Sequence, residues 1–495
     1  MAFSTLTFLV IFLPLSLIGY YLINNKIKNI FLLIVSLLFY ICGGAASLPV
    51  LAGSILFNYI IALIMDRACR TKITKRIAMI SAVTVNIGLL FCFKYLSYII
   101  SASAAIFDTG ISAPSWSMPL GISFFTFSSI SYILDIYFGT SKSEKNLLDV
   151  ALFITFFPKM ISGPIVKWNT FQSQLADRKF SLDALSNGVV RFIIGLGKKV
   201  IIADTIGVMA DYAFNRDNFS ELSVLAAWFG VLAYLIQLYF DFSGYSDMAI
   251  GIGKMFGFTI DENFDYPYVS KSVVEYWARW HITLGTWLKN YLYTPIFRSL
   301  SKKKNSAGKK KFSIKACDTI ALLVTWIIIG EWHGAGLKFL IYGLYYFLFI
   351  LLERKSDNYK KKRAKEGNPV KENFFIKSFL PHIYLIVVVI FGQLLFRANS
   401  LSDAFGYLGA MFGMSGAFTS VPDMYYVSQY VLIFFIGVLF SIPWLRISKI
   451  PQKIEGTYLG LICDNVGKLL LLGILIVSVA FTVGSTYNAF IYFNF

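Results

Sequence analysis

The feature that most constrains this chain is a succession of apolar segments long enough to cross a lipid bilayer. Of its 495 residues, 57% are hydrophobic and only 15% are charged, whereas a soluble domain carries about a quarter charged residues. A transmembrane helix needs roughly 20 apolar residues, within about 17–25. The sequence therefore predicts an all-α, polytopic integral membrane protein and excludes a soluble or disordered chain. The predicted spans are Phe3–Ile23, Phe31–Ile41, Leu51–Met65, Ile77–Phe93, Leu120–Phe138, Val189–Ala213, Leu222–Phe240, Phe379–Phe396, Tyr426–Pro443 and Lys468–Val483.

Five other apolar segments are too short or too interrupted to cross the bilayer cleanly. Non-spanning segments are tolerated at membrane depth only when they are buried in protein or line a wet cavity. Because they cluster in the middle of the chain, we expect re-entrant helices around a central funnel or tunnel. These segments are Leu147–Met160, Met248–Phe256, Val273–Phe297, Thr319–Gly330 and Lys338–Leu352.

The net charge of +18 is carried by short basic runs between apolar segments, such as 302–304 and 360–363. Cytoplasmic loops of membrane proteins have this bias, so we expect the basic links in the cytoplasm and both termini outside. The runs also suit anionic head groups of the bilayer, and no nucleic-acid partner is expected. The basic links lie near Lys26 and at 67–76, 301–315, 353–371 and 446–453.

Several further expectations concern organisation. The five cysteines show no CxxC or Cys/His spacing, so neither a disulfide framework nor a metal site is expected. The first apolar segment lacks a basic region and a cleavage site, so we expect it to be retained as a span. We divide the chain into amino-terminal spans (1–118), a catalytic core (119–400) and carboxy-terminal spans (401–495).

The sequence Gly330-Glu331-Trp332-His333-Gly334 lies between two apolar stretches whose outer loops are both basic. These stretches should therefore form a hairpin with His333 at its turn. Arms of about 15 residues would reach roughly 22 Å, less than the hydrocarbon thickness of about 30 Å. We expect His333 at membrane depth, where a neutral imidazole can accept a proton from an attacking hydroxyl. A hydrogen-bonded structural histidine is the alternative.

His281 follows Trp280 and Arg279 in the interrupted segment 273–297. The mixture of aromatic and basic residues around it is typical of an interfacial amphipathic helix. The residues alone support a structural and a functional role equally. The third histidine, His382, is explained by an interfacial position at the start of a span.

A polar cluster follows the predicted span 222–240 and contains Gln237, Asp241, Ser243, Tyr245 and Asp247. Asp241 could orient a catalytic histidine, hold a partner's cation or cap a helix. Helix capping and a solvated turn are the favoured roles for Asp247.

Several motifs, in order, resemble the membrane-bound O-acyltransferase family and its alginate-acetylation branch. They run from about Pro119 to Arg397. The branch commonly has two arginines before Trp–His, where this chain has Ala278 and Arg279, which leaves the donor open. The matching segments are Pro119–Phe124, Ile161–Ile165, Tyr239–Ala249, Trp280–Leu284, Trp287–Pro295, Glu331–Gly334 and Phe396–Ala398.

The resemblance implies a ring of tilted helices around a tunnel, with a thioester donor entering from the cytoplasm and the acceptor from the other side. It implies His333 as the acyl-transfer base and His281 as the second characteristic residue. Tunnel or substrate contacts are expected for the following set: Trp332, Glu331, Gly334, Trp280, Arg279, Asp241, Ser243, Tyr245 and Gln237.

We therefore expect an enzyme of the bacterial plasma membrane that moves an acyl group, most simply acetyl from acetyl-CoA, towards a cell-surface polysaccharide. A secreted or membrane-anchored acetyltransferase would be its partner, and no bound cofactor is expected. The alternatives are D-alanyl transfer to teichoic acid, a transporter or flippase, and a non-catalytic scaffold.

Overall fold

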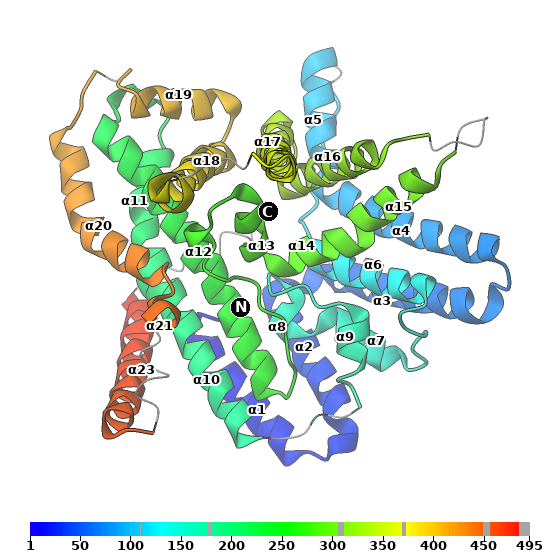
Figure 1. Ribbon diagram of the computed structural model, residues 1–495. Coiled ribbons are helices and arrows are strands. Elements are labelled where there is room, and N and C mark those ends of the chain that lie inside the picture. Colours follow the sequence, from blue (N-terminus) through cyan, green and yellow to red (C-terminus); the bar gives the residue numbers. More distant parts are fainter. Residues whose placement is uncertain are drawn as a thin grey trace. The chain divides into compact units, whose positions relative to one another are not determined.

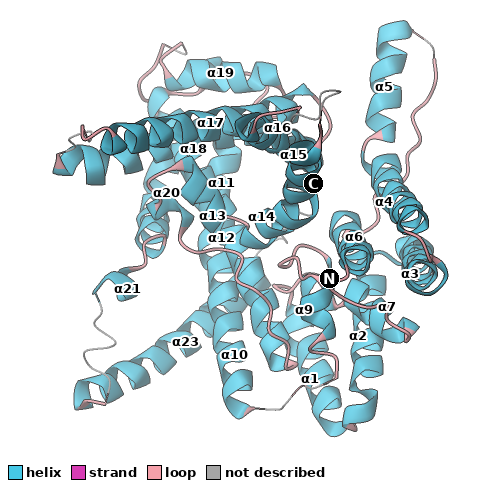
Figure 2. Cartoon of the chain, turned by 45° about the vertical axis from the view of Figure 1, so that its right-hand side comes forward, coloured by secondary structure: helices cyan, strands magenta, loops and turns pink. Residues whose placement is uncertain are grey.

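The computed structural model describes residues 1–108, 110–176, 178, 181–304, 311–368, 373–414, 416–448 and 456–484. Within these ranges every regular element is a helix, and the one β-type pairing is an isolated bridge between Phe264 and Trp280 (Figure 2). The prediction of an all-α protein is confirmed.

The chain forms two compact units. The first comprises Met1–Gly195, Tyr245–Glu262 and Thr482–Phe495, and the second comprises Leu196–Gly244 and Asn263–Phe481. The long helix α12 (Val224–Met255) contributes residues to both. The predicted division at residues 118 and 400 stays a prediction.

The first unit holds these helices (Figure 1): α1 (Leu13–Leu22), α2 (Lys28–Gly44), α3 (Leu48–Leu63), α4 (Lys72–Lys94), α5 (Leu96–Phe107), α6 (Ile122–Phe138), α7 (Leu147–Thr155), α8 (Phe157–Met160), α9 (Trp168–Gln172) and most of α10 (Leu182–Gly197). The second unit holds the π-helical turn η5 (Lys198–Ala203), then α11 (Asp204–Phe214), α13 (Val273–Arg279), α14 (Ile282–Leu288), the π-helical turn η8 (Lys289–Tyr293), α15 (Thr294–Lys302), α16 (Ile314–His333), α17 (Leu337–Lys365), α18 (Leu380–Arg397), α19 (Leu401–Met411), α20 (Val421–Phe440), α21 (Trp444–Ser448) and most of α23 (Tyr458–Gly484).

Six stretches of the described chain are long and apolar enough to cross a membrane, and the protein is a multi-pass membrane protein. They are Asn25–Ala68, which contains both α2 and α3, Lys72–Lys94, Val224–Met255, Phe375–Arg397, Val421–Phe440 and Gly460–Gly484. The orientation of the termini and the central tunnel stay predictions. Parts of the predicted basic links lie outside the described residues, namely 305–310, 369–371 and 449–453.

Two of the predicted interruptions are confirmed. The segment 273–297 is divided into α13, α14, η8 and the start of α15. The segment 147–160 is divided where α7 ends at Thr155 and α8 begins at Phe157 with Pro158 in its first turn.

One other predicted interruption is wrong, and the segments 319–330 and 338–352 lie in helices that are longer than expected, although neither helix is among the six candidate spans of the described residues. Residues 248–256 belong almost entirely to the continuous helix α12. The hairpin arms are longer than expected: α16 has 20 residues and α17 has 29, so at about 1.5 Å per residue α16 reaches roughly 30 Å. The hairpin is not short, because both helices continue beyond the apolar stretches into segments that contain charged residues. One of them, Asp318, pairs with Arg354 of α17 at 2.6 Å.

Helices α16 and α17 pack closely in the second unit and lie side by side in both views (Figures 1 and 2). A Cβ atom at Gly330 would collide with the carbonyl oxygen of Phe339, and one at Gly343 would collide with that of Trp326. Each glycine therefore allows the backbone of the other helix to approach, which fixes the end of α16 where His333 lies.

We predict that Gly343→Ala lowers the stability of the detergent-solubilised protein by about 1–3 kcal/mol, because the added methyl group must push α17 away from α16. The matched control is Gly473→Ala in α23, where a Cβ atom meets nothing within 4 Å. Thermal unfolding should separate the two variants. Equal unfolding midpoints would contradict the close crossing.

Candidate functional site

His281 lies at a sharp turn between α13 and α14 in the second unit. The turn is built by antiparallel pairing of residues 263–265 with 279–282. Asp265 N–H donates to the Arg279 carbonyl at 3.0 Å, and Ile282 N–H donates to the Asn263 carbonyl at 3.0 Å. This pairing interrupts the helix and places His281 in the left-handed region, with φ of +46°. Non-glycine residues rarely adopt that conformation, and they do so preferentially at functional sites.

The His281 imidazole is buried, with 3% of the residue exposed. Its Nδ1 lies 3.0 Å from Oδ1 of Asn263, and the Phe242 ring of α12 lies edge-on with centroids 4.7 Å apart. Its Nε2 has no hydrogen-bond partner in the part of the chain that the structure describes. The turn thus holds one ring nitrogen and leaves the other available.

Burial also sets the charge of this ring. His281 lies in a turn outside the six membrane-spanning stretches, and burial lowers the pKa of its imidazole from 6.5 to about 3. The ring is therefore neutral at physiological pH, which is the form that can accept a proton.

His333 is the last residue of α16 and is also buried, with 5% exposed. Aromatic rings surround it: Phe396 of α18 at a centroid distance of 5.0 Å and Tyr342 of α17 at 5.8 Å. Trp332 lies 4.7 Å from the His333 ring and 6.4 Å from the His281 ring. The structure therefore brings His281, Trp332 and His333 together, although 51 residues separate the first from the second in the sequence.

The turn after His333 is tight. Gly334 lies against the Phe339 ring, which would collide with any Cβ atom, and Gly336 has φ of +114°. Both positions therefore need glycine. Glu331, two residues before His333 in α16, is partly buried.

The polar cluster at 237–247 is not a helix end, because all of it lies inside α12. The predicted capping role of Asp247 is therefore wrong. Asp247 is 5% exposed and belongs to the first unit, where it pairs with Arg191 at 2.6 Å. Tyr245 also belongs to the first unit and stacks on Phe3 at 4.7 Å.

Asp241 pairs with a cation of the same chain. Lys199 of η5 lies 2.7 Å from Asp241 and 2.5 Å from Asp204, and its side chain is only 5% exposed. These ion pairs join η5 and α11 to α12, and Asp241 and Lys199 are buried whereas Asp204 is partly exposed. Ser243 is buried in the same turn, and Gln237 packs against Gly207 of α11.

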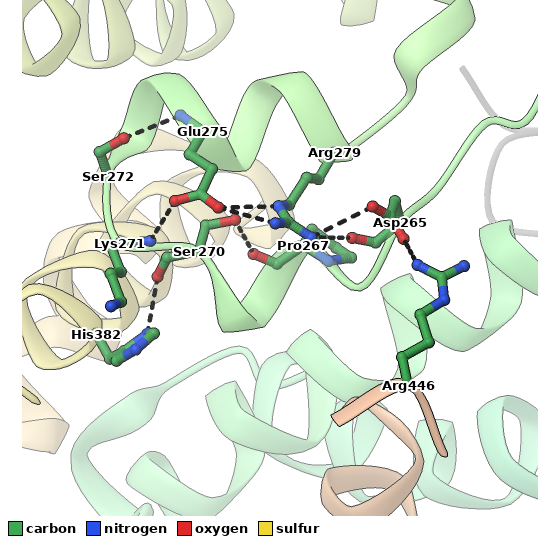
Figure 3. A network of polar contacts seen from close by, with 9 residues as sticks. All are labelled: Asp265, Pro267, Ser270, Lys271, Ser272, Glu275, Arg279, His382 and Arg446. Atoms are coloured by element: carbon green, nitrogen blue, oxygen red, sulfur yellow. Dashed lines mark hydrogen bonds and ion pairs between the residues drawn. The ribbon is translucent and has the colours of Figure 1, made fainter. Parts of the chain in front are cut away.

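Arg279, two residues before His281, lies in a network of polar contacts (Figure 3). Its guanidinium group pairs with Glu275 at 3.0 Å and with Asp265 at 3.3 Å, and Asp265 also binds Arg446 at 2.5 Å. Trp280 is buried among aromatic rings, including Phe264 at 5.1 Å. In the same network, Nδ1 of His382 lies 3.0 Å from the Ser270 carbonyl oxygen.

Sequence reasoning missed three contributors: Asn263, which holds His281, Lys199, which binds Asp241, and Tyr342, which packs on His333. A buried lysine in an apolar segment is a signal that could have indicated an acidic partner. Nothing in the local sequence marks Asn263. Among the described residues, no group of three or more His, Cys, Asp or Glu side chains is arranged to hold a metal ion.

Comparison with known proteins agrees with this architecture. Residues 140–363 match the model of the membrane-bound O-acyltransferase family. The "Probable alginate O-acetylase AlgI" of Pseudomonas putida is 35% identical over the whole length of both chains. The peptidoglycan O-acetyltransferase of Helicobacter pylori is 32% identical and covers 84% of this chain and 80% of its own length. The teichoic acid D-alanyltransferase of Bacillus subtilis is 27% identical, covering 56% of this chain and 71% of its own.

The described chain is an all-helical, multi-pass membrane protein in which two buried histidines lie beside one tryptophan. The full-length similarity then specifies the class: the chain belongs to the membrane-bound O-acyltransferase family. The predicted resemblance is confirmed.

We predict that Lys199→Met destabilises the protein by about 3–5 kcal/mol, because the buried carboxylate of Asp241 and the partly exposed carboxylate of Asp204 lose their cation. Asp204→Asn should cost clearly less, since the pair between Lys199 and Asp241 remains. Thermal unfolding in detergent measures both. An Asp204→Asn variant as unstable as Lys199→Met would contradict the central position of the lysine.

Proposed function

We propose that this protein transfers acetyl groups from a cytoplasmic thioester towards hydroxyl groups of a cell-surface polysaccharide. The observation that carries the proposal is the 35% identity to an alginate O-acetylase over both entire chains. The name of the peptidoglycan O-acetyltransferase supports the same reaction on a second polysaccharide. D-alanyl transfer is the weaker candidate, because the D-alanyltransferase of B. subtilis matches 56% of the chain at lower identity.

In the proposed reaction, His333 acts as the general base. Its imidazole takes the proton of the acceptor hydroxyl while that oxygen attacks the thioester carbonyl carbon. The resulting tetrahedral intermediate expels the thiolate, which takes up a proton as the ester forms. The rings of Phe396, Tyr342 and Trp332 pack around the imidazole, and they would keep water away and so protect the thioester from hydrolysis.

The donor in this proposal is acetyl-CoA, a soluble cytoplasmic thioester, and the membrane is the bacterial plasma membrane. Because the polysaccharide lies on the other side, the acetyl group must be handed across the bilayer. A secreted or membrane-anchored acetyltransferase would complete the transfer to the polymer. Residues of the second unit would shape the path, namely Glu331, Gly334, Trp280, Arg279, Asp241, Ser243 and Gln237.

We predict that His333→Ala reduces the O-acetyl ester content of the surface polysaccharide by on the order of 10²-fold or more, because the proton acceptor is lost. Ester content in cells producing equal amounts of each variant is the measurement. The matched control is His382→Ala. It removes a half-buried histidine that contacts the backbone carbonyl of Ser270 and is not one of the residues packed around His333.

The His382→Ala variant should retain ester formation close to that of the wild type. Normal ester content in His333→Ala, with the protein inserted in the membrane, would contradict catalysis by this residue and favour a scaffold.

A further inference from the structure

We propose that Asn263 is a positioning residue that fixes the tautomer of His281, so that Nε2 of His281 accepts a hydrogen bond from a hydroxyl group of the acceptor. This inference rests on the proposed function, because it identifies a second hydroxyl of the acceptor, beside the one that reacts at His333, as the ligand of His281. It assigns a role to a residue that no motif in the sequence indicates.

The first step is the orientation of the Asn263 amide. The oxygen and nitrogen of a side-chain amide are distinguished by their hydrogen-bond partners. Oδ1 of Asn263 lies 3.3 Å from the backbone nitrogen of Thr283 and 2.8 Å from its hydroxyl. A backbone N–H can only donate, so the atom that faces it must be the carbonyl oxygen.

The second step is the position of the proton on His281. The same oxygen lies 3.0 Å from Nδ1. Because an amide oxygen can only accept, Nδ1 must carry the hydrogen. A neutral imidazole has a single N–H, so Nε2 has a bare lone pair. The neutral form is favoured by the surroundings, since Asn263, Phe242 and Trp332 are all uncharged.

The third step is the ligand that this lone pair suits. Nε2 is buried and meets no hydrogen-bond donor among the residues described, and a buried acceptor without a donor costs free energy. Of the two reactants, the thioester group carries no donor, whereas a polysaccharide acceptor carries several hydroxyl groups. A hydroxyl other than the one that reacts at His333 therefore fits Nε2.

The fold holds Asn263 in place through its main chain as well. Its carbonyl accepts from Ile282 N–H at 3.0 Å, directly after His281, so its backbone and its side chain bind the same turn. The side chain is fully buried. Asn263 and His281 therefore cannot move independently, and the tautomer is built into the turn.

The test uses nitrogen NMR of the full-length protein in lipid, labelled with 15N in histidine. The chain has only three histidines, so His333→Gln and His382→Gln assign the spectrum. Asn263→Leu keeps a similar volume but removes the acceptor. Thr283→Val is the matched control, because it removes one donor to Oδ1 and leaves the contact between Asn263 and His281.

We expect the wild type and Thr283→Val to show a protonated Nδ1 and a bare Nε2 on His281. Asn263→Leu should lose this signature, and its rate of ester formation should fall on the order of 10²-fold, the cost of misplacing a bound reactant. A merely structural role of Asn263 would change protein stability without this change of tautomer.

A proton on Nε2 in the wild type would overturn the inference, and this result needs no variant to fold. An Asn263→Leu protein that keeps either the wild-type tautomer or the wild-type rate would overturn it as well. The spectrum does not depend on activity, so the two failures can be told apart. A wild-type protein that forms no ester would overturn the proposed function, whereas a proton on Nε2 of His281 would overturn only this inference.

Discussion

The site depends on one short backbone pairing, between residues 263–265 and 279–282. Two backbone hydrogen bonds and the bridge between Phe264 and Trp280 interrupt what would otherwise be one helix from Val273 onwards. The interruption turns His281 inward, brings the Asn263 side chain to its Nδ1, and leaves Arg279 in a network of ion pairs.

The same physical requirement governs the polar groups inside the apolar helices. A polar group without a partner is costly where water is absent, and this protein provides partners within the chain. Lys199 lies between Asp204 and Asp241, and in the first unit Asn58 and Asn86 exchange hydrogen bonds between α3 and α4. Nε2 of His281 is buried and has no hydrogen-bond partner among the described residues, and we therefore assign a ligand as its partner.

Hydropathy and loop charge predicted the all-helical membrane fold, and interruptions of hydropathy predicted the broken segments 147–160 and 273–297. The same signal failed for α12, α16 and α17. A charged residue lowers the local hydropathy and so predicts the end of an apolar helix, even when an ion-pair partner far along the chain allows the helix to continue. Asp241 is neutralised by Lys199 and Asp318 by Arg354, so the helices continue. His281 and His333 were identified as candidates, but their approach to Trp332 and the contact with Asn263 depend on tertiary structure.

The central claim is that this membrane protein places acetyl esters on a surface polysaccharide. The most direct measurement is proton NMR of surface glycans from cells that lack the protein and from the same cells after it is restored. The account predicts that O-acetyl signals disappear while the sugar signals stay unchanged, and that they return with the wild-type protein. An unchanged pattern of O-acetyl signals in the cells that lack the protein would contradict it.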